Sequence, residues 1–225
     1  MVIMMKLDLS KIKFSNNDIR NRVRIPNILT PKLAEFIGII VGDGHVGYYK
    51  YPRMGNPSVN YDIRVSGNSK DWDYYSEYVN NLADELFNLR FYVIKPKNEN
   101  SIMLYKNSKA LYYLFSELLG IPPRKDEIKI PEQIFNSSNE IKSSFLRGLA
   151  DSDFTFMIQN RNGKIYPRVK GCSKSGILIE QVSCILKEMA ITHCTTFEKS
   201  YYEKREKLYE RHVVYINGFN NVREW

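Results

Sequence analysis

The sequence has few of the residues that build disulfide frameworks and zinc sites. It holds three cysteines and three histidines in 225 residues. The cysteines are odd in number, show no C-x-x-C spacing, and predict separate thiols rather than a disulfide framework. The histidines form no ligand cluster, which argues against a structural zinc site. These residues are Cys172, Cys184, Cys194, His45, His193 and His212.

Long apolar runs and an excess of acid are also missing. No apolar stretch approaches the roughly 18 residues of a membrane span, and "MVIMMKLDLSKIKF" is too short and charged for a signal peptide. We therefore expect an intracellular, cytoplasmic protein without a membrane partner. Thirty-three Lys and Arg against twenty-five Asp and Glu give a net charge of +8. With sixteen tyrosines, many beside basic residues, this favours a polyanionic partner.

The stretch "IIVGDGHVG", residues 39–47, contains the pattern G-x-G-x-x-G. A dinucleotide-binding turn needs a strand before this pattern and a helix after it. Here Thr30 and Pro31 predict a helix start before it, and apolar residues then recur at helical spacing. The glycines therefore end a helix. A dinucleotide-dependent enzyme stays possible only if residues 37–41 form a strand.

The chain repeats itself. At an offset of 110 positions, "KLAEFIGIIVGDGHVG" matches "SSFLRGLADSDFTFMI", with Gly38 on Gly148 and Asp43 on Asp153. "MLYKN" matches "VVYIN" at the same offset, whereas "IRVSGNSK" matches "PRVKGCSK" at 104. We attribute the six-residue difference to a longer loop over residues 51–58. Three matched blocks in order predict an internal duplication.

Each half predicts the same order of elements: a helix ending in an acidic turn, two strands, an amphipathic helix and two further strands. The fold class is therefore α+β, with two αββαββ(α) repeats. We divide the chain into an N-terminal extension (1–28), a first repeat (29–121), a linker (122–142) and a second repeat (143–225). The basic run 199–211 is expected to form a loop or hairpin tip.

Small residues recur four apart on both predicted motif helices, so the two helix backbones can approach closely. Each stripe ends at an aspartate, Asp43 or Asp153, and parallel packing would set the two side by side. Carboxylates at helix C-termini oppose the helix dipole unless a cation offsets them. With backbone carbonyls, including those of Gly42 and Ser152, they predict a Mg²⁺ site. The interface stripes are Ala34, Gly38, Gly42, Ser144, Gly148 and Ser152.

"FIGIIVGDG", "LRGLADSDF" and "LLGIPPRKDEIKIP" together resemble the LAGLIDADG homing endonucleases in their single-chain, two-repeat form. The resemblance covers nearly the whole chain after residue 30. It implies a saddle of antiparallel sheets, with the motif helices at a pseudo-twofold interface. It also implies a monomer that makes a metal-dependent, staggered double-strand break in a long asymmetric DNA site, in intron homing. Asp43 and Asp153 would bind Mg²⁺, for which Mn²⁺ can substitute, and Lys125 would assist catalysis.

DNA contacts are expected from the sheet faces. Arg64 and Arg168 are candidates to read guanine edges, and Lys70 and Lys174 suit phosphates. Tyr61 and Tyr166 complete this set of predicted DNA-binding residues. Strand alternation sets Tyr61, Ile63 and Val65 on one side and Asp62, Arg64 and Ser66 on the other.

The sequence departs from the family pattern at several positions. Phe154 stands where the family usually has glycine, and Gly67 and Gly171 stand where it often has glutamine. The alternative is thus an RNA-splicing maturase, with intron RNA as partner, or a decayed member that only binds nucleic acid. Both aspartates favour cleavage. Because no splicing-domain residues flank the repeats, a free-standing or intron-encoded enzyme is favoured over an intein.

Overall fold

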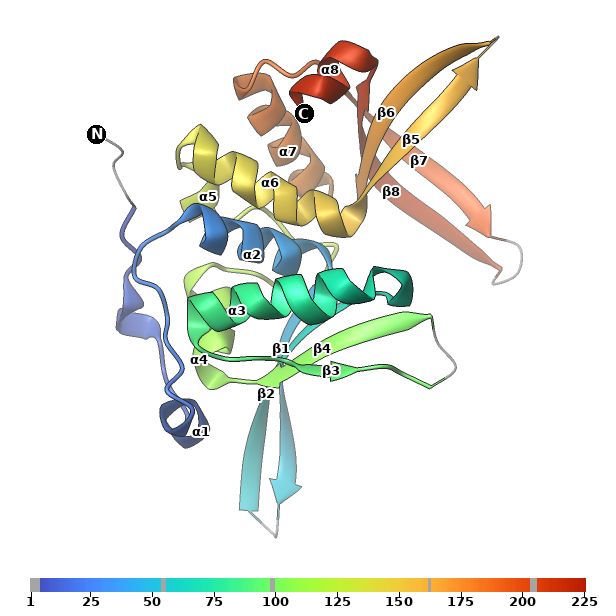
Figure 1. The fold of residues 1–225 in the computed structure, drawn as a ribbon. Helices are drawn as coiled ribbons and strands as arrows, with labels where there is room; N and C mark the ends of the chain where they lie inside the picture. The colour runs from blue at the N-terminus through green and yellow to red at the C-terminus, as the bar shows by residue number, and fades with distance from the viewer. Residues whose placement is uncertain (1–4, 54–55, 98–99, 162, 203–205) are drawn as a thin grey trace. The chain divides into compact units, whose positions relative to one another are not determined.

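The chain forms two four-stranded antiparallel sheets of identical topology (Figure 1). A computed structural model describes residues 5–53, 56–97, 100–161, 163–202 and 206–225. The first sheet has the order β1-β2-β4-β3 and the second the order β5-β6-β8-β7. The predicted α+β class, with two repeats of the same order, is confirmed.

The first half contains the N-terminal extension and the first sheet. Its elements are η1 (Leu9–Lys11), α1 (Asn16–Arg20), α2 (Pro31–Gly42), β1 (Gly44–Arg53), β2 (Asn56–Asn68), η2 (Ser69–Asp71), the π-helical turn η3 (Tyr74–Val79), α3 (Asn80–Phe87), β3 (Tyr92–Ile94), β4 (Ser101–Asn107), α4 (Lys109–Tyr112) and η4 (Tyr113–Leu118). Phe36, Phe87 and Phe115 pack ring against ring in its core.

The second half repeats this order. Its elements are α5 (Glu132–Phe135), α6 (Asn139–Asp153), β5 (Phe154–Arg161), β6 (Lys164–Ser173), α7 (Gly176–Glu188), β7 (Cys194–Tyr202), β8 (Lys207–Asn217) and α8 (Phe219–Glu224). Leu178, Val182 and Ile185 lie on the buried face of α7, which packs on the second sheet. None of the helices in the described residues is both long and apolar enough to cross a bilayer.

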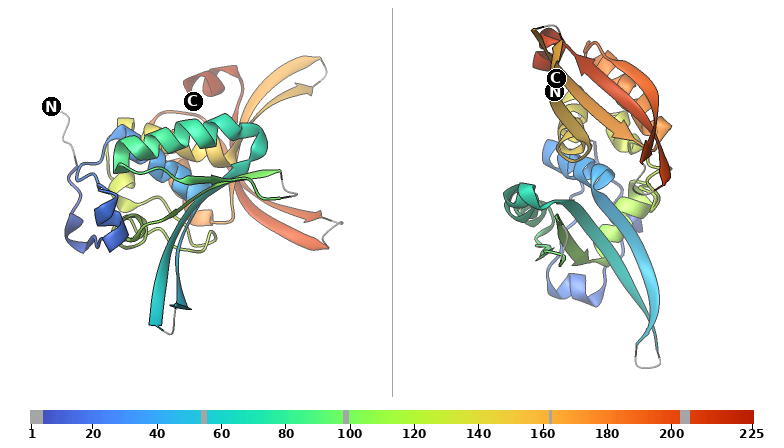
Figure 2. Two further views of the ribbon diagram at one scale, coloured as in Figure 1. Left: turned by 60° about the horizontal axis from the view of Figure 1, so that its bottom comes forward. Right: turned by 90° about the vertical axis from the view of Figure 1, so that its right-hand side faces the viewer.

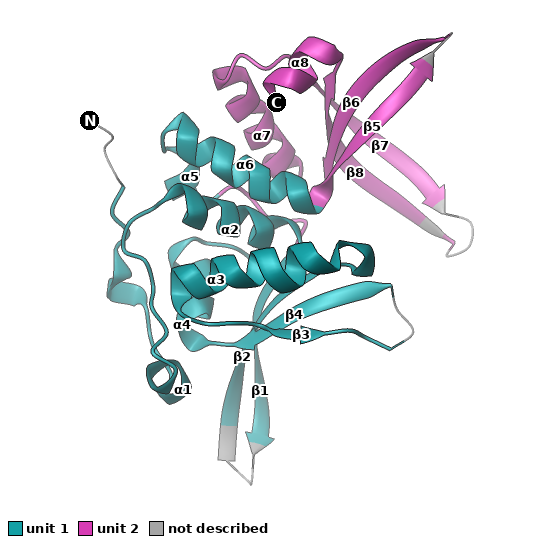
Figure 3. Cartoon of the chain, in the orientation of Figure 1, with its two compact units in different colours: residues 1–123, 131–152 teal, residues 124–130, 153–225 magenta. Residues whose placement is uncertain are grey.

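The chain divides into two compact units (Figure 3). Unit 1 contains residues 1–123 and 131–152, and unit 2 contains residues 124–130 and 153–225. Helix α6 belongs to the second repeat by sequence but clusters with α2 in unit 1. The unit boundary therefore differs from the repeat boundary. The four-part division by repeats remains a prediction.

Helices α2 and α6 approach each other within unit 1 at their glycines. The Thr30 side chain caps α2 by accepting from the Leu33 amide, and Pro31 occupies its first turn. A Cβ on Gly38 would lie 2.2 Å from the Phe145 carbonyl oxygen, and one on Gly148 would lie 2.0 Å from that of Glu35. Only glycine fits this approach. Because residues 31–42 are helical, the dinucleotide-turn interpretation is wrong.

Strand pairing corrects the predicted alignment of the two repeats. Val65 pairs with Gly44 and Gly171 with Phe154, so Val65 corresponds to Gly171 at an offset of 171 − 65 = 106. Pairing with β4 and β8 gives the same offset. The offset of 104 is therefore wrong by two residues, and Gly67 is not the counterpart of Gly171. A two-residue shift preserves the strand faces, so the residue pattern alone could not reveal it.

The first hairpin continues as a ribbon beyond the sheet (Figure 2). The predicted loop over residues 51–58 is mostly strand, because β1 extends to Arg53 and β2 begins at Asn56. Residues 54–55 lie outside the described part. The basic run 199–211 is likewise strand up to Tyr202 and again from Lys207. These residues pair with one another at the far end of the β7–β8 hairpin, which agrees with the hairpin-tip form of the prediction and not with a loop; residues 203–205 are not described.

Candidate active site and nucleic-acid interface

Asp43 occupies the C-cap of α2, directly before β1. Its amide donates to the Ile39 carbonyl at 2.9 Å, and its own carbonyl accepts from the Ser66 amide on β2 at 3.1 Å. The side chain is half-buried, and its Oδ2 accepts a hydrogen bond of 2.6 Å from the Tyr75 hydroxyl. The last turn of the motif helix, a neighbouring strand and a phenol thus fix this carboxylate.

Tyr75 reaches Asp43 across Gly67. The tyrosine is 3% exposed, and a Cβ on Gly67 would lie 2.1 Å from its Cζ atom. Any larger residue at position 67 would occupy the space of the ring. The glycine at this position is therefore explained by the aromatic side chain that covers it.

Three phenols of the π-helical turn η3 bind carboxylates on the motif helices. Besides Tyr75, Tyr78 donates to Glu35 on α2 at 2.5 Å, and Tyr74 donates to Asp151 on α6 at 3.3 Å. Glu35 is 1% exposed and also pairs with Arg147 on α6. Burial and the hydrogen bond to Glu35 raise the pKa of Tyr78 to about 12, so the phenol keeps its proton at neutral pH.

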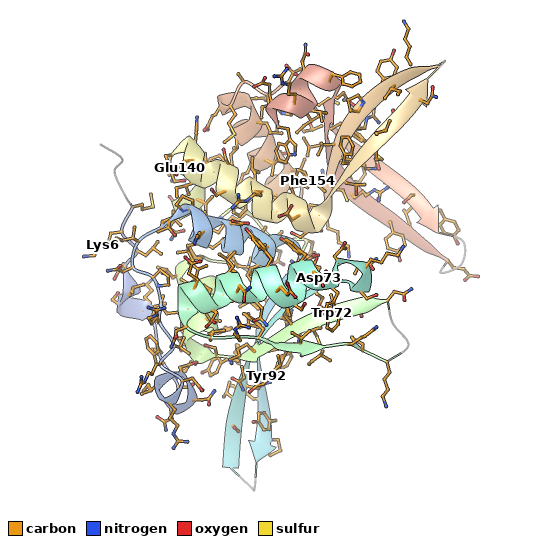
Figure 4. All side chains as sticks on the ribbon, in the orientation of Figure 1. Lys6, Trp72, Asp73, Tyr92, Glu140 and Phe154 are labelled. Carbon is orange, nitrogen blue, oxygen red and sulfur yellow. The ribbon has the colours of Figure 1, made fainter. Side chains whose placement is uncertain are left out.

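Asp153 is the last residue of α6 and lies in unit 2 with Lys125. Burial raises the pKa of the Asp153 carboxyl, and the positive charge of Lys125 opposes that rise. Phe154 follows at the start of β5 (Figure 4). Its ring stacks on Trp225 with centroids 5.6 Å apart, and a Cβ on Gly171 would lie 2.4 Å from it. Phe154 thus fills the space that Gly171 leaves.

The two motif aspartates offer oxygen ligands at the negative ends of helices. Ionised carboxylates in such positions favour a hard divalent cation. Among the described residues, no group of three or more His, Cys, Asp and Glu side chains could hold a metal. A cation on either aspartate would need further oxygen ligands from the backbone, water or a phosphate. The donor set fits Mg²⁺ or Mn²⁺, which keep several such ligands. The side-by-side placement of the two carboxylates remains a prediction.

The first sheet presents Arg64 on the face opposite to Ile63 and Val65. The predicted alternation is observed, since Ile63 and Val65 are fully buried and Arg64 is partly exposed. Arg64 pairs with the buried Asp62 and lies 6.0 Å from the centre of the Tyr105 ring. Tyr61 lies on the opposite, helix-covered face, where it contacts the rings of Tyr112 and Tyr113.

The second sheet carries a denser set of charges on its partly exposed face. Lys170 and Arg211 both pair with Glu198, and the Tyr215 hydroxyl donates to the same carboxylate. The hydrogen bonds from Tyr215 and Lys170 lower the pKa of Glu198 to about 2. Arg168 lies 4.6 Å from the centre of the Tyr215 ring. In this cluster the Glu198 carboxylate is held in place among the basic side chains of Lys170, Arg211 and Arg168.

The other predicted contact residues lie at the ends of these strands. Tyr166 on β6 is 42% exposed, and Lys70 and Lys174 are exposed after β2 and β6. By strand pairing, the counterpart of Arg64 is Lys170, because Arg64 faces Tyr105 and Lys170 faces Tyr215. The offset of 104 gave Arg168 instead. The DNA roles of all these residues remain predictions.

Tyr75, Lys170 and the Glu198 cluster were not predicted from the sequence. The residues around Tyr75 show the pattern of an amphipathic α-helix. Its contact with Asp43 depends on a π-helical turn, for which the sequence contains no known motif. The lack of a side chain at Gly67 was the one sequence signal that could have indicated a large residue packed over this position. Lys170 could have been found from the correct strand offset.

Curated relatives match between about half and nearly all of the chain, and they carry unrelated names. No protein-family profile matches the sequence. A component of the A-type ATP synthase of Pyrococcus abyssi is 30% identical over 56% of this chain and 11% of its own length. In Methanocaldococcus jannaschii, glutamine–fructose-6-phosphate aminotransferase is 34% identical over 59% and 11%, and a probable translation initiation factor IF-2 is 26% identical over 98% and 18%. The chain thus spans between a tenth and a fifth of these relatives' lengths.

Solved structures match nearly the whole chain. The homing endonuclease I-DmoI, in complex with DNA and Ca, is 22% identical with a TM-score of 0.54, over 83% of this chain and 82% of that one. The LAGLIDADG homing endonuclease I-LtrWI, bound to target DNA, is 13% identical with a TM-score of 0.57, over 87% and 82%. The similarity to these structures agrees with the duplicated sheets and the two motif helices of this chain. The chain has the fold of the LAGLIDADG homing endonucleases.

Proposed function

We propose that this chain is a site-specific DNA endonuclease that cleaves both strands of a long, asymmetric site with a divalent metal. The observation that carries the proposal is the repeated pairing of a motif helix that ends in an aspartate with a four-stranded sheet. One copy supplies Asp43 and the other supplies Asp153. The chain shares its fold with homing endonucleases whose structures contain DNA and Ca or Mn.

The two aspartates are the residues proposed to hold the metal. A bound divalent cation would supply charge stabilisation and an activated water for phosphodiester hydrolysis. Asp43 is held by the end of α2 and by Tyr75. Asp153 is buried enough to raise its pKa, so a cation would favour its ionised form. Lys125, close enough to Asp153 to affect that pKa, is proposed to stabilise charge on the phosphate or to orient water.

The sheet faces are proposed to bind the duplex. Arg64 and Arg168 are the candidates for base contacts, and Lys70 and Lys174 for phosphates. Lys170 joins this set because it is the structural counterpart of Arg64. Tyr166 is exposed on the same sheet as Arg168, whereas Tyr61 lies on a helix-covered face and is not retained.

The matches to curated relatives support the proposal that this chain corresponds to a mobile segment found within different host proteins. The three relatives are named as proteins of different activities: an ATP synthase component, an aminotransferase and a translation factor. The segment that each shares with this chain is a minor part of its length. A mobile endonuclease segment inside otherwise unrelated proteins accounts for both facts.

The proposal is tested by incubating the purified chain with genomic DNA of its source organism and Mg²⁺, then mapping new ends by sequencing. We expect recurrent staggered ends at one long site, absent for Asp43→Asn and for Asp153→Asn. Both variants should still bind that site in Ca²⁺. Parallel reactions with Mn²⁺ establish which metals support cleavage.

Two results would contradict the proposal. Cutting that is unchanged in both aspartate variants would remove the assigned residues from catalysis. A folded chain that binds nucleic acid but makes no specific ends would favour the alternative, a maturase or a binding protein. Tighter binding to intron RNA than to duplex DNA would identify the maturase.

A further inference from the structure

The geometry points to Tyr75 as the residue that positions Asp43 for a divalent cation in the first repeat. The inference rests on the metal role proposed for Asp43. Tyr75 is a positioning residue, because its hydroxyl contacts the carboxylate rather than the reacting atoms. Its hydrogen bond to Asp43 Oδ2, 2.6 Å long, is within the range of a strong bond to an ionised acceptor.

The position of the Tyr75 ring is set by a specific feature of the first sheet. A Cβ on Gly67 would stand 2.1 to 2.3 Å from two ring atoms and the hydroxyl oxygen of Tyr75. Tyr75 is 3% exposed, and the ring of Tyr74 meets its ring edge-on with centroids 5.0 Å apart. The hydroxyl therefore has little freedom to leave Asp43.

The π-helical turn explains how the helix presents this phenol. A π-helical turn holds an extra residue, and such turns occur frequently at functional sites. Here residues 74–79 are π-helical and residues 80–87 continue as an α-helix. The turn sends Tyr75 to Asp43 at the end of α2, while Tyr78 reaches Glu35 near its start. One turn thus contacts both ends of the motif helix.

The hydrogen bond has a consequence for metal binding. A donor on Oδ2 fixes the carboxylate rotamer, so the remaining lone pairs keep one direction. Groups that orient a metal ligand from outside typically change metal affinity about tenfold to a hundredfold when they are removed. At the corresponding place in the second repeat, the Phe154 ring packs on Gly171, and the positive charge of Lys125 opposes the rise in the pKa of Asp153.

The test is Mn²⁺ binding to the full chain without DNA, with free Mn²⁺ measured by electron paramagnetic resonance. Asp43→Asn identifies the binding event that belongs to Asp43. We expect Tyr75→Phe, which keeps the ring and removes the hydroxyl, to weaken that event about tenfold or more. Gly67→Ala, which displaces the ring, should have the same effect. Tyr74→Phe is the matched control: it removes a neighbouring phenol bonded to Asp151 and should leave binding unchanged.

The outcomes separate this inference from the proposed function. If Asp43→Asn removes a binding event that Tyr75→Phe leaves intact, the positioning role is overturned and the metal role of Asp43 stands. If Tyr74→Phe weakens binding as much as Tyr75→Phe, a general effect of the turn replaces the specific one. If wild type and Asp43→Asn bind Mn²⁺ identically, Asp43 holds no metal and both statements fail.

Discussion

Gly38 on α2 lies against the main chain of Phe145 on α6, where an added Cβ would stand 2.2 Å from the carbonyl oxygen. Because this neighbour is backbone, it cannot move aside as a side chain would. We expect Gly38→Ala to lower the free energy of unfolding by about 3 kcal/mol or more. Alanine is the better helix former by about 1 kcal/mol, so the loss arises from the contact. Urea denaturation measures it.

Ser144→Ala is the control for that variant. Ser144 was predicted on the same stripe, but it is only partly buried and its hydroxyl bonds back to the Glu140 carbonyl of its own helix. Its replacement should change the free energy of unfolding by less than about 0.5 kcal/mol. Equal stability of Gly38→Ala and wild type would contradict the close helix approach.

The burial of Asp153 makes folding stability depend on pH. Its pKa is raised in the folded state above the ordinary value of 3.8, so the folded state binds the proton more tightly. The associated stability is complete below that ordinary value and is lost as the pH rises through the folded-state value. We expect Asp153→Asn to raise the melting temperature at pH 7, and the gain to vanish toward pH 3. A gain that is the same at both pH values would exclude the carboxylate as its source.

Gly171 and Phe154 are expected to depend on each other. Gly171→Ala would place a Cβ 2.4 Å from the Phe154 ring, at a cost of about 1 to 3 kcal/mol. In a Phe154→Ala background this space is open, so the same substitution should cost much less. A double-mutant cycle by chemical denaturation should give a coupling of about 1 kcal/mol or more. Additive effects would show that the ring yields freely.

Lys174 should contribute to nucleic-acid binding through charge alone. We expect Lys174→Ala to weaken binding at low salt and to reduce the slope of log affinity against log salt by about 1. Lys187→Ala is the matched control, since Lys187 is exposed on α7, a helix that covers the second sheet. Equal slopes for both variants and wild type would place the DNA away from Lys174.

Most of the fold could be predicted from the sequence because each half of the chain carries the same pattern of helices and strands. The close approach at Gly38 and Gly148, the helix start at Thr30 and the alternation around Arg64 depend on local chemistry, and the structure contains each of them. The strand offset was predicted wrongly because a shift of two residues preserves every face. Tyr75 was missed because its contact with Asp43 depends on a single π-helical turn and the space above Gly67.

The first hairpins of the two sheets, β1–β2 and β5–β6, differ in length. Gly44 and its partner Val65 are 65 − 44 = 21 positions apart, whereas Phe154 and Gly171 are 171 − 154 = 17 apart. The first hairpin is therefore longer by two residues on each strand, about 6 to 7 Å of extra reach. Insertions and deletions in such pairs leave every inward and outward side chain where it was. The reach of each arm can therefore change without altering the chemistry at its base.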